Sequence, residues 1–428
     1  MRLKFTVDDI AIRLYLFALL IITLVPFGRG SFSGLEPAVP FIILSFIIFS
    51  LKKKHIDKKK WLVIFMFFLW AVWIISGIAF SYITYDKLAD HESSFLRYVR
   101  LLEMYFPALL VFVFINELSP EQKKTVYRFF IFLFFAVTIQ AAWGWFMQVE
   151  NLVATQRFSY PGMGYIYRAG GVANDSSAYG NLAMILGVAS LIGLRHTSRS
   201  KFLYLLIILA LAFNVYISLT RTVVFALAVY VFLDLIRTRS LSVFKMLFFA
   251  AVISGIVFYG ISNEYVAALL DRITGSGQID ITSGRLATWA AVPDILGENP
   301  IFGVGYRMAT EKYGIVTDNV FISTMLETGI IGMILYLGML ASICYNAAMP
   351  QCRNAAMPQC RNAAMPQCRN AAMPQCRNAE SIPLLIAFIS SGMFVDISTF
   401  WVSIPALIFF VAVNSQRDDH CSVHRARE

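Results

Sequence analysis

Long apolar runs separated by short charged stretches dominate the chain. The run WLVIFMFFLWAVWIISGIAF, residues 61–80, contains no charged residue. About 20 consecutive apolar residues form a helix long enough to cross the hydrocarbon core of a bilayer. The pattern therefore predicts a polytopic membrane protein built from transmembrane helices.

Reading each apolar run between its charged boundaries predicts about twelve transmembrane spans. They cover residues 10–27, 36–51, 61–80, 101–115, 126–147, 178–194, 202–219, 222–236, 243–261, 330–345, 382–395 and 397–413. The last two runs are so close that they are either two spans or one kinked helix. The predicted fold class is all-α, with residues 1–428 forming a single integral membrane domain.

Composition excludes an ordinary soluble protein. Hydrophobic residues make up 58% of the chain and charged residues only 14%, and the mean hydropathy is +0.67. Soluble domains carry about 25% charged residues. The formal net charge of +10 comes largely from basic loops such as KKKHIDKKK, residues 52–60. It indicates topology and contact with anionic membrane lipids, and not binding to nucleic acid.

Lys and Arg in short loops predict the orientation, because such loops stay in the cytoplasm. If both termini are cytoplasmic, residues 52–60 and most of the 36 Lys and Arg residues lie inside. The loops at residues 148–177 and 262–329 then lie outside, and residues 346–379 form a cytoplasmic loop. Loops as long as the two outer ones are usually functional or disordered, and their many aromatic residues argue against disorder.

The large outer loop is predicted to contain short structured segments. LATWAAVPDIL, residues 286–296, and FISTMLETG, residues 321–329, indicate short helices at the membrane surface, separated by Gly/Pro turns. The loop is therefore expected to be structured, which makes it a candidate for a functional role.

Two arginines on the predicted outer side are candidates for anion binding. Arg221 lies between two apolar runs without an acidic neighbour, and Arg168 lies in the glycine-rich stretch RAGGVANDSSAYGN. Arg221 either extends to lipid phosphates or faces an internal cavity that binds an anion. Guanidinium groups match phosphate oxygens in pairs, so converging arginines suit a pyrophosphate. Asn174 in the same stretch either shapes a turn or binds substrate.

Asp318, Asn319 and Glu327 form a polar group around an apolar helix start. One interpretation is a helix N-cap, in which a short polar side chain accepts backbone N–H bonds. The other is catalysis, in which a carboxylate near the arginines acts as general base on a sugar hydroxyl. Both interpretations remain open.

Arg285 and Trp289 are spaced one helical turn apart. They form either a cation–π pair on a loop helix or part of a carbohydrate site, where the indole packs against sugar C–H groups.

In their order along the chain, these motifs resemble the bacterial superfamily of O-antigen ligases and polysaccharide polymerases. The matching residues are Arg168–Gly171 with Asn174, Ser218 with Thr220–Arg221, Gly284–Arg285 with Trp289, Pro300 with Phe302–Gly303 and Gly305, and Asn319 with Glu327, Gly329 and Gly332. The resemblance covers residues 168–332 and the overall pattern of twelve spans with one large outer loop.

The resemblance implies a membrane glycosyltransferase of the C type in the bacterial inner membrane, with its active site facing the periplasm. Its donor would be a glycan linked to undecaprenyl pyrophosphate. Arg168 and Arg221 would hold the pyrophosphate, Arg285 would stabilise the leaving group, and Asp318 would act on the acceptor. No metal, cofactor or nucleotide is implied, because arginines can stabilise the leaving charge.

One departure from the family pattern bears on the reaction. Ligases of this superfamily typically carry His-Asn where this chain carries Asp318-Asn319, and Asp-Asn resembles the polymerase branch. We therefore predict a polymerase of lipid-linked oligosaccharide repeat units, making surface polysaccharide of the O-antigen or capsule type. The alternative is a ligase that transfers the glycan to lipid A core or to a protein. A lipid-linked sugar transporter is disfavoured because the spans read as unbroken and the polar groups lie on one side.

The octapeptide NAAMPQCR occurs four times without change over residues 346–377 and carries four of the six cysteines. A cysteine spacing of eight does not resemble the Cys-x2–4-Cys pairs of zinc sites, and a cytoplasmic loop disfavours disulfides. The octanucleotide AATGCCGC in tandem encodes the same octapeptide, so the repeat indicates a DNA tract that can change length. We interpret it as a candidate on/off genetic switch.

Overall fold

The computed structural model describes residues 6–25, 36–52, 58–85, 88–115, 118–147, 154–160, 164–171, 175–197, 200–238, 285–348, 380–399 and 402–415. Some predictions lie wholly or partly outside these residues: the span at 243–261, the role of Asn174, the first part of the outer loop at 262–329 and most of the cytoplasmic loop at 346–379.

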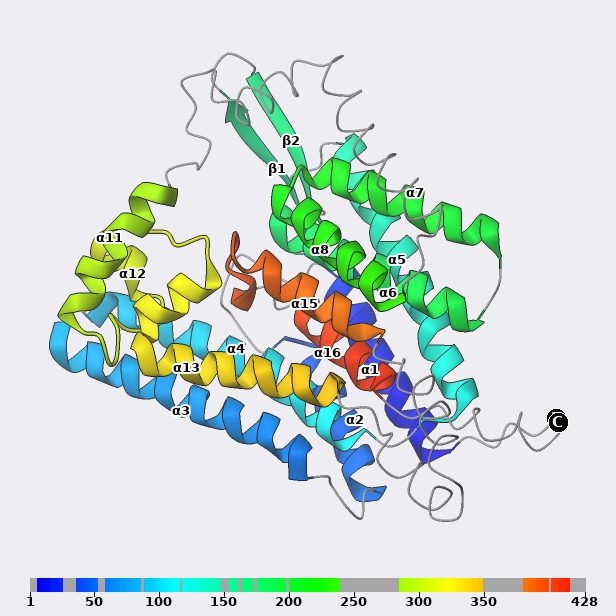
Figure 1. The fold of residues 1–428 in the computed structure, drawn as a ribbon, viewed down its shortest axis with the longest axis horizontal. Coiled ribbons are helices and arrows are strands. Elements are labelled where there is room, and N and C mark those ends of the chain that lie inside the picture. Colours follow the sequence, from blue (N-terminus) through cyan, green and yellow to red (C-terminus); the bar gives the residue numbers. More distant parts are fainter. Residues whose placement is uncertain are drawn as a thin grey trace, which may run out of the picture.

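The described chain is helical except for one β-hairpin (Figure 1). The helices are α1 Val7–Leu24, α2 Val39–Lys52, α3 Lys58–Tyr85, α4 Leu88–Phe114, α5 Pro120–Met147, α6 Ser176–Thr197, α7 Lys201–Ser218, α8 Arg221–Thr238, α11 Arg285–Glu298, α12 Met308–Tyr313, α13 Val320–Ala348, α15 Ser381–Ser391 and α16 Ser403–Asn414, with the 3-10 turn η3 Ile397–Thr399. The antiparallel strands are β1 Ala154–Tyr160 and β2 Gly164–Gly171. The sequence analysis did not predict this hairpin in the first outer loop.

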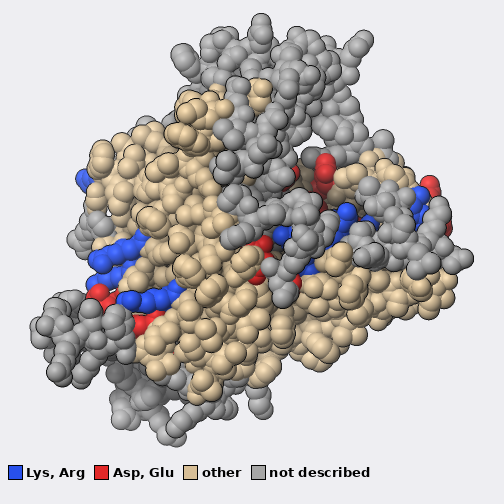
Figure 2. Space-filling view, turned by 180° about the vertical axis from the view of Figure 1, so that it is seen from behind, with Lys and Arg blue, Asp and Glu red and all other residues tan. Residues whose placement is uncertain are grey.

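Five of the described helices are long and apolar enough to cross a membrane. They are Lys59–Thr84, Pro120–Met147, Ser176–Thr197, Lys201–Ser218 and Val320–Ala348. Uncharged residues cover most of the described surface in Figure 2, and Lys and Arg gather in limited patches. These features support a multi-pass membrane protein. The prediction of about twelve spans is therefore supported only in part.

The helix ends that the sequence places on the cytoplasmic side meet at one end of the bundle, here called the inner end. The Nδ2 of Asn346 at the end of α13 donates to the backbone oxygen of Lys59 at 3.1 Å. Tyr127 near the start of α5 donates to Asn414 at the end of α16 at 2.9 Å. The opposite end, where β2 and α11 lie in Figure 1, is called the outer end. Which end faces the cytoplasm stays a prediction.

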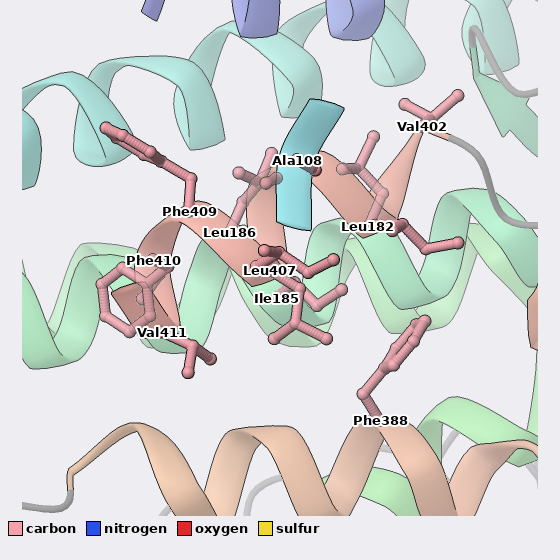
Figure 3. Close-up of a cluster of buried hydrophobic side chains, with 14 of the residues drawn as sticks. Ala108, Leu182, Ile185, Leu186, Phe388, Val402, Leu407, Phe409, Phe410 and Val411 are labelled. Atoms are coloured by element: carbon pink, nitrogen blue, oxygen red, sulfur yellow. The ribbon is translucent and has the colours of Figure 1, made fainter. Parts of the chain in front are cut away.

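The centre of the molecule is built from α6 and α16. Residues 403–413 of α16 are buried on every side, as are residues 178–194 of α6. Figure 3 shows their side chains interlocking with residues of α4 and α15, including Ala108 and Phe388. A helix that is apolar all round belongs in a protein interior. Van der Waals packing between such helices supplies much of the association energy within a bilayer.

The helices α15 and α16 are short compared with their neighbours. Tyr127 of α5 and Asn414 of α16 are hydrogen-bonded and therefore lie at the same level near the inner end. From this level α5 runs about 30 Å toward the outer end, to Met147, at 1.5 Å per residue. Helix α16 covers only about 17 Å in the same direction, to Ser403. The segment joining α15 to α16 is therefore recessed below the outer ends of the long helices. The two runs form separate helices, and not one kinked helix.

Helix α13 is broken at Gly329, whose φ of 71° and ψ of −175° are not helical. A Cβ at this position would overlap the backbone oxygen of Ile301, so only glycine fits. The short helix predicted at 321–329 is confirmed as the first part of α13, which ends at this kink, and the second part contains the predicted span at 330–345. The predicted helix at 286–296 is confirmed as α11.

The kink leaves backbone groups of α13 to be satisfied by other segments. The oxygens of Leu326 and Glu327 accept from the backbone N–H groups of Val304 and Gly305, at 2.9 and 3.1 Å. The oxygen of Thr328 accepts from the Trp73 indole at 2.8 Å. Irregular backbone in a membrane protein is tolerated only where such partners exist. The segment PIFGVGY, residues 300–306, thus fastens the outer part of α13.

Candidate functional site

The segment between α15 and α16 is where several elements of the outer end meet. We define residues 392–399 as the α15–α16 connection. The backbone N–H of Val320, at the start of α13, donates to the oxygen of Gly392 at 2.9 Å. Phe225, one turn into α8, packs edge-on against Phe394, with ring centroids 5.1 Å apart. The starts of α8 and α13 are therefore held against the same short segment.

A buried ionic pair joins the large outer loop to this connection. The Nη1 of Arg307 lies 2.6 Å from the Oδ2 of Asp396, and both side chains are less than a fifth exposed. Ser398 donates to the other carboxylate oxygen at 2.5 Å and accepts from Arg307 at 3.3 Å. Arg307 is one of two non-glycine residues with positive φ in the described chain, at 62°. Such a backbone persists only where surrounding contacts determine it, and it is often found at functional sites.

Glu327 belongs to the same cluster from the side of α13. Its buried carboxylate interacts with the guanidinium and backbone N–H of Arg307 and with the hydroxyl of Ser323. Arg307 therefore faces two carboxylates, those of Asp396 and Glu327. Burial opposes the charged guanidinium, but these two carboxylates more than offset it and raise the pKa of Arg307. Burial also raises the pKa of the adjacent Tyr306 to about 12.

Arg221 is the first residue of α8, and its side chain is exposed. The turn before it contains Leu219 in the left-handed conformation and Thr220, whose hydroxyl donates to the backbone oxygen of Ser176 at 3.1 Å. The starts of α6 and α8 are thus adjacent. A helix N-terminus carries a partial positive charge, so Arg221 and the α8 dipole together favour an anion.

Arg168 lies in β2, half-buried, three residues before the strand ends at Gly171. A Cβ at Gly171 would collide with the ring of Tyr179, so this glycine lets the strand approach α6 closely. The Trp145 indole donates to the oxygen of Tyr167 at 3.2 Å and fixes the strand to α5. Arg168 and Arg221 therefore lie on elements that meet at the outer start of α6.

The two residues of the Asp-Asn motif have different roles in the fold. The Oδ1 of Asn319 accepts from the backbone N–H groups of Phe321 and Ile322, at 2.9 and 3.1 Å. Asn319 is therefore the N-cap of α13, as one of the two interpretations predicted. Asp318, which is only half-buried, lies just before it.

Arg285 and Trp289 both lie on α11, which belongs to the predicted large outer loop. The side chain of Arg285 is outside the described residues, so its pairing with the indole stays a prediction. Helix α11 packs against the loop and α13 through a small core that includes Val292, Val304 and Leu326. The indole nitrogen of Trp289 is buried and has no hydrogen-bond partner among the described residues.

The sequence analysis missed Arg307, Asp396 and Ser398. Asp396 is a carboxylate placed between two apolar runs, and an ionisable residue inside such a stretch is a functional candidate by default. Arg307 directly follows the glycine turn of PIFGVGY. Nothing in the sequence, however, indicates that these two residues, 89 positions apart in the numbering, form a pair.

The fold and site define the class as a helical, multi-pass membrane protein whose arginines and carboxylates gather at one end. Residues 205–337 match the model of the O-antigen ligase family. This segment runs from α7 into α13 and includes Arg221, Arg285, Asp318 and Glu327. The resemblance to the superfamily of O-antigen ligases and polymerases is thus confirmed.

A curated relative extends this similarity beyond the matched segment. The chain is 25% identical over 334 residues to an O-antigen polymerase from Salmonella muenchen, covering 71% of this chain and 80% of the relative. The similarity therefore concerns most of the membrane domain.

Proposed function

We propose that this protein is a membrane glycosyltransferase that polymerises oligosaccharide repeat units carried on undecaprenyl pyrophosphate. Transfer takes place at the outer end of the bundle, on the periplasmic side of the inner membrane. The observation that carries the proposal is that α8 and α13 contact the segment that pairs with Arg307, through Phe225 and Val320. Arg221 and the Asp318–Asn319 motif lie at the starts of these two helices. The family match to this region supports the same class of reaction.

In this proposal each polar residue has a chemical task. Arg168 and Arg221 bind the donor pyrophosphate, with the N-terminus of α8 adding to the positive field. Arg285 stabilises the charge that develops as the lipid pyrophosphate leaves. Asp318 accepts the proton from the attacking sugar hydroxyl, while Asn319, Glu327 and Trp289 shape the acceptor site.

Asp318 can be tested without disturbing the cap of α13, because Asn319 makes the capping bonds. Asp318→Asn preserves the shape of the side chain and removes the base. We expect a loss of turnover of roughly 10²-fold or more, with an unchanged unfolding temperature. Full activity of this variant, measured with purified protein, would remove Asp318 from the mechanism.

The reaction itself is tested with purified protein and a lipid-linked repeat unit as sole substrate. A polymerase uses one repeat unit as donor and another as acceptor, so longer lipid-linked chains should form. No elongation without an added core acceptor would contradict the proposal.

The second candidate is a ligase, favoured by the description of the matching family as O-antigen ligase. A ligase transfers glycan to lipid A core, or to a protein, only when that acceptor is supplied. Asp at position 318, where ligases typically carry His, and the relative described as an O-antigen polymerase support the first candidate.

The transporter alternative is disfavoured by the spans and by the placement of the polar groups. The kink of α13 at Gly329 lies just before the predicted span at 330–345, and α15 and α16 are short but uninterrupted. The polar groups of the candidate site meet at the outer end, and the similarity to ligases and polymerases supports an enzyme.

A further inference from the structure

The octapeptide repeat is the sequence feature that the proposed function leaves unexplained. Its two flanks lie in the described part of the chain. Asn346, the first repeat residue, donates through Nδ2 to the backbone oxygens of Lys59 and Ser342, at 3.1 and 2.9 Å. Glu380, which follows the repeat segment, lies 3.1 Å from His196 and 3.6 Å from Arg237. Both flanks are therefore fastened at the inner end.

The coding arithmetic of the repeat has an unusual property. Three copies of AATGCCGC read AAT GCC GCA ATG CCG CAA TGC CGC, which encodes Asn-Ala-Ala-Met-Pro-Gln-Cys-Arg. Because eight and three share no factor, all three reading frames of such a tract encode the same cyclic octapeptide, without a stop codon. Gain or loss of one octanucleotide therefore leaves the repeat itself readable and changes the protein only beyond the repeat.

The part of the chain beyond the repeat that the structure describes consists of Glu380, α15, the α15–α16 connection and α16 with its flanking residues. Residues 403–413 of α16 are completely buried at the centre of the bundle. The connection supplies Asp396 to Arg307 and the oxygen of Gly392 to the start of α13. A shifted chain therefore lacks both the central helix and one side of the candidate site.

We propose that the repeat tract is an on/off switch of protein production that acts through the fold. A change of one or two octanucleotides removes α15 and α16 and leaves a chain that cannot complete its core. A change of three octanucleotides adds or removes one octapeptide and leaves the fold intact. This inference does not depend on the sugar chemistry of the proposed function.

The fold should tolerate the gain or loss of complete octapeptides, because the residues that flank the repeat are held by partners outside it. Asn346 and Glu380 keep their partners on α3, α6 and α8 whatever the number of repeats between them. The entropy of closing a loop grows only with the logarithm of its length. The candidate site lies at the outer end and the two fastened flanks lie at the inner end, so we expect whole octapeptides to leave the site unchanged.

The genetic part is tested with two alleles that encode the identical protein. One carries the native tract, and the other is recoded with synonymous codons that differ between the octapeptides. Each carries a fluorescent reporter fused in frame to the C-terminus. The native allele should switch fluorescence off and on, with single octanucleotides lost or gained in the sequenced tract, while the recoded allele should not switch. Equal switching of both alleles, or native codons that already differ between the units, would overturn the proposal.

The structural part is tested in the recoded background with an N-terminal tag. Variants with two, three or five octapeptides should give folded, monodisperse protein in detergent within about two-fold of the four-repeat level. A variant shifted by one octanucleotide after the repeat should give no folded protein. Loss of fold in the whole-octapeptide variants, or a folded shifted chain, would each contradict the account. Neither readout uses glycan transfer, so the result is independent of whether the protein is a polymerase.

Discussion

Two ionic clusters join helices at opposite ends of the bundle, and they are built differently. At the inner end, Asp234 pairs with Arg195 at 3.5 Å and with Arg237 at 2.8 Å, and Glu380 binds Arg237 and His196. Here two arginines face two carboxylates. At the outer end, the single Arg307 faces the two carboxylates Asp396 and Glu327.

The two clusters also differ in the regularity of the backbone that carries their side chains. Apart from Glu380, which directly precedes α15, the residues of the inner cluster project from the regular ends of α6 and α8. The outer cluster lies on a loop residue with positive φ, beside the kink at Gly329 and on the short α15–α16 connection. Balanced charges on regular helices indicate a structural fastening. Irregular backbone with two carboxylates around one arginine indicates a site prepared for substrate, at a cost in stability.

The largest expected effect separates the two clusters directly. Asp396→Ala leaves Arg307 with one carboxylate fewer, and Asp234→Ala leaves two inner arginines without their shared partner. Breaking a buried ion pair costs about 3–5 kcal/mol, so both variants should unfold at lower temperature in detergent. Only Asp396→Ala should also lower the activity of the fraction that remains folded. Equal specific activity in both variants would show that the outer cluster is structural as well.

Arg221→Ala tests whether substrate is bound at the outer end and not at the inner end. Removing one charge-stabilising donor typically costs roughly 10²–10³-fold in turnover, and we expect this loss without a change in membrane insertion. Arg128→Ala is the matched control, because Arg128 is an exposed arginine near the inner start of α5. Turnover of lipid-linked substrate should be normal in the control. A fully active Arg221→Ala would remove the proposed pyrophosphate contact.

Much of the helical layout could be predicted, because apolar runs and charged boundaries are local signals. The predicted run at 202–219 differs by one position at each end from α7, and the run at 126–147 ends where α5 ends but begins six residues after its start. The capping role of Asn319 was one of two interpretations and is confirmed. The pairing of Arg307 with Asp396 could not be predicted, since it depends on how the last two helices return into the bundle.

The irregular parts were the hardest to predict from sequence. The kink at Gly329 depends on a tertiary contact, because the segment PIFGVGY supplies the missing backbone partners. The β-hairpin was missed because its strands lie inside a loop whose length was the main signal. The shortness of α15 and α16 was hidden because their apolar runs nearly touch in the sequence.

A smaller loss of stability is expected when Gly329 of α13 is replaced, with Gly338 of the same helix as the control position. Gly329→Ala places a Cβ against the backbone oxygen of Ile301 and forces positive φ on alanine, which should cost about 1–3 kcal/mol. Gly338→Ala is the control, since its Cβ meets only the flexible Met66 side chain at 3.5 Å. Thermal unfolding of the two variants should therefore differ. Similar unfolding temperatures would mean that the kink is not required.

The smallest effect concerns acid sensitivity at the inner end. Burial opposes ionisation of Glu380, but the hydrogen bond and charge of His196, with Arg237 and Arg195, lower its pKa below the usual 4.5. A lowered carboxyl pKa stabilises the fold above that pH, and the contribution is lost as the pH falls through the folded-state value. Glu380→Gln should remove this contribution, at most about 1 kcal/mol, and reduce the loss of stability below pH 4.5. An unchanged pH profile of unfolding would exclude the role of Glu380.

The most direct test of the central claim asks which end binds the lipid-linked donor. A photo-crosslinking amino acid at Val316, an exposed residue two positions before Asp318, reports on the outer end. The same amino acid at Phe202, exposed near the inner start of α7, reports on the inner end. With radiolabelled undecaprenyl-pyrophosphate glycan, the account predicts strong labelling at position 316 that Arg221→Ala removes, and little at position 202. Equal labelling at both positions, or labelling at 316 that survives Arg221→Ala, would contradict it.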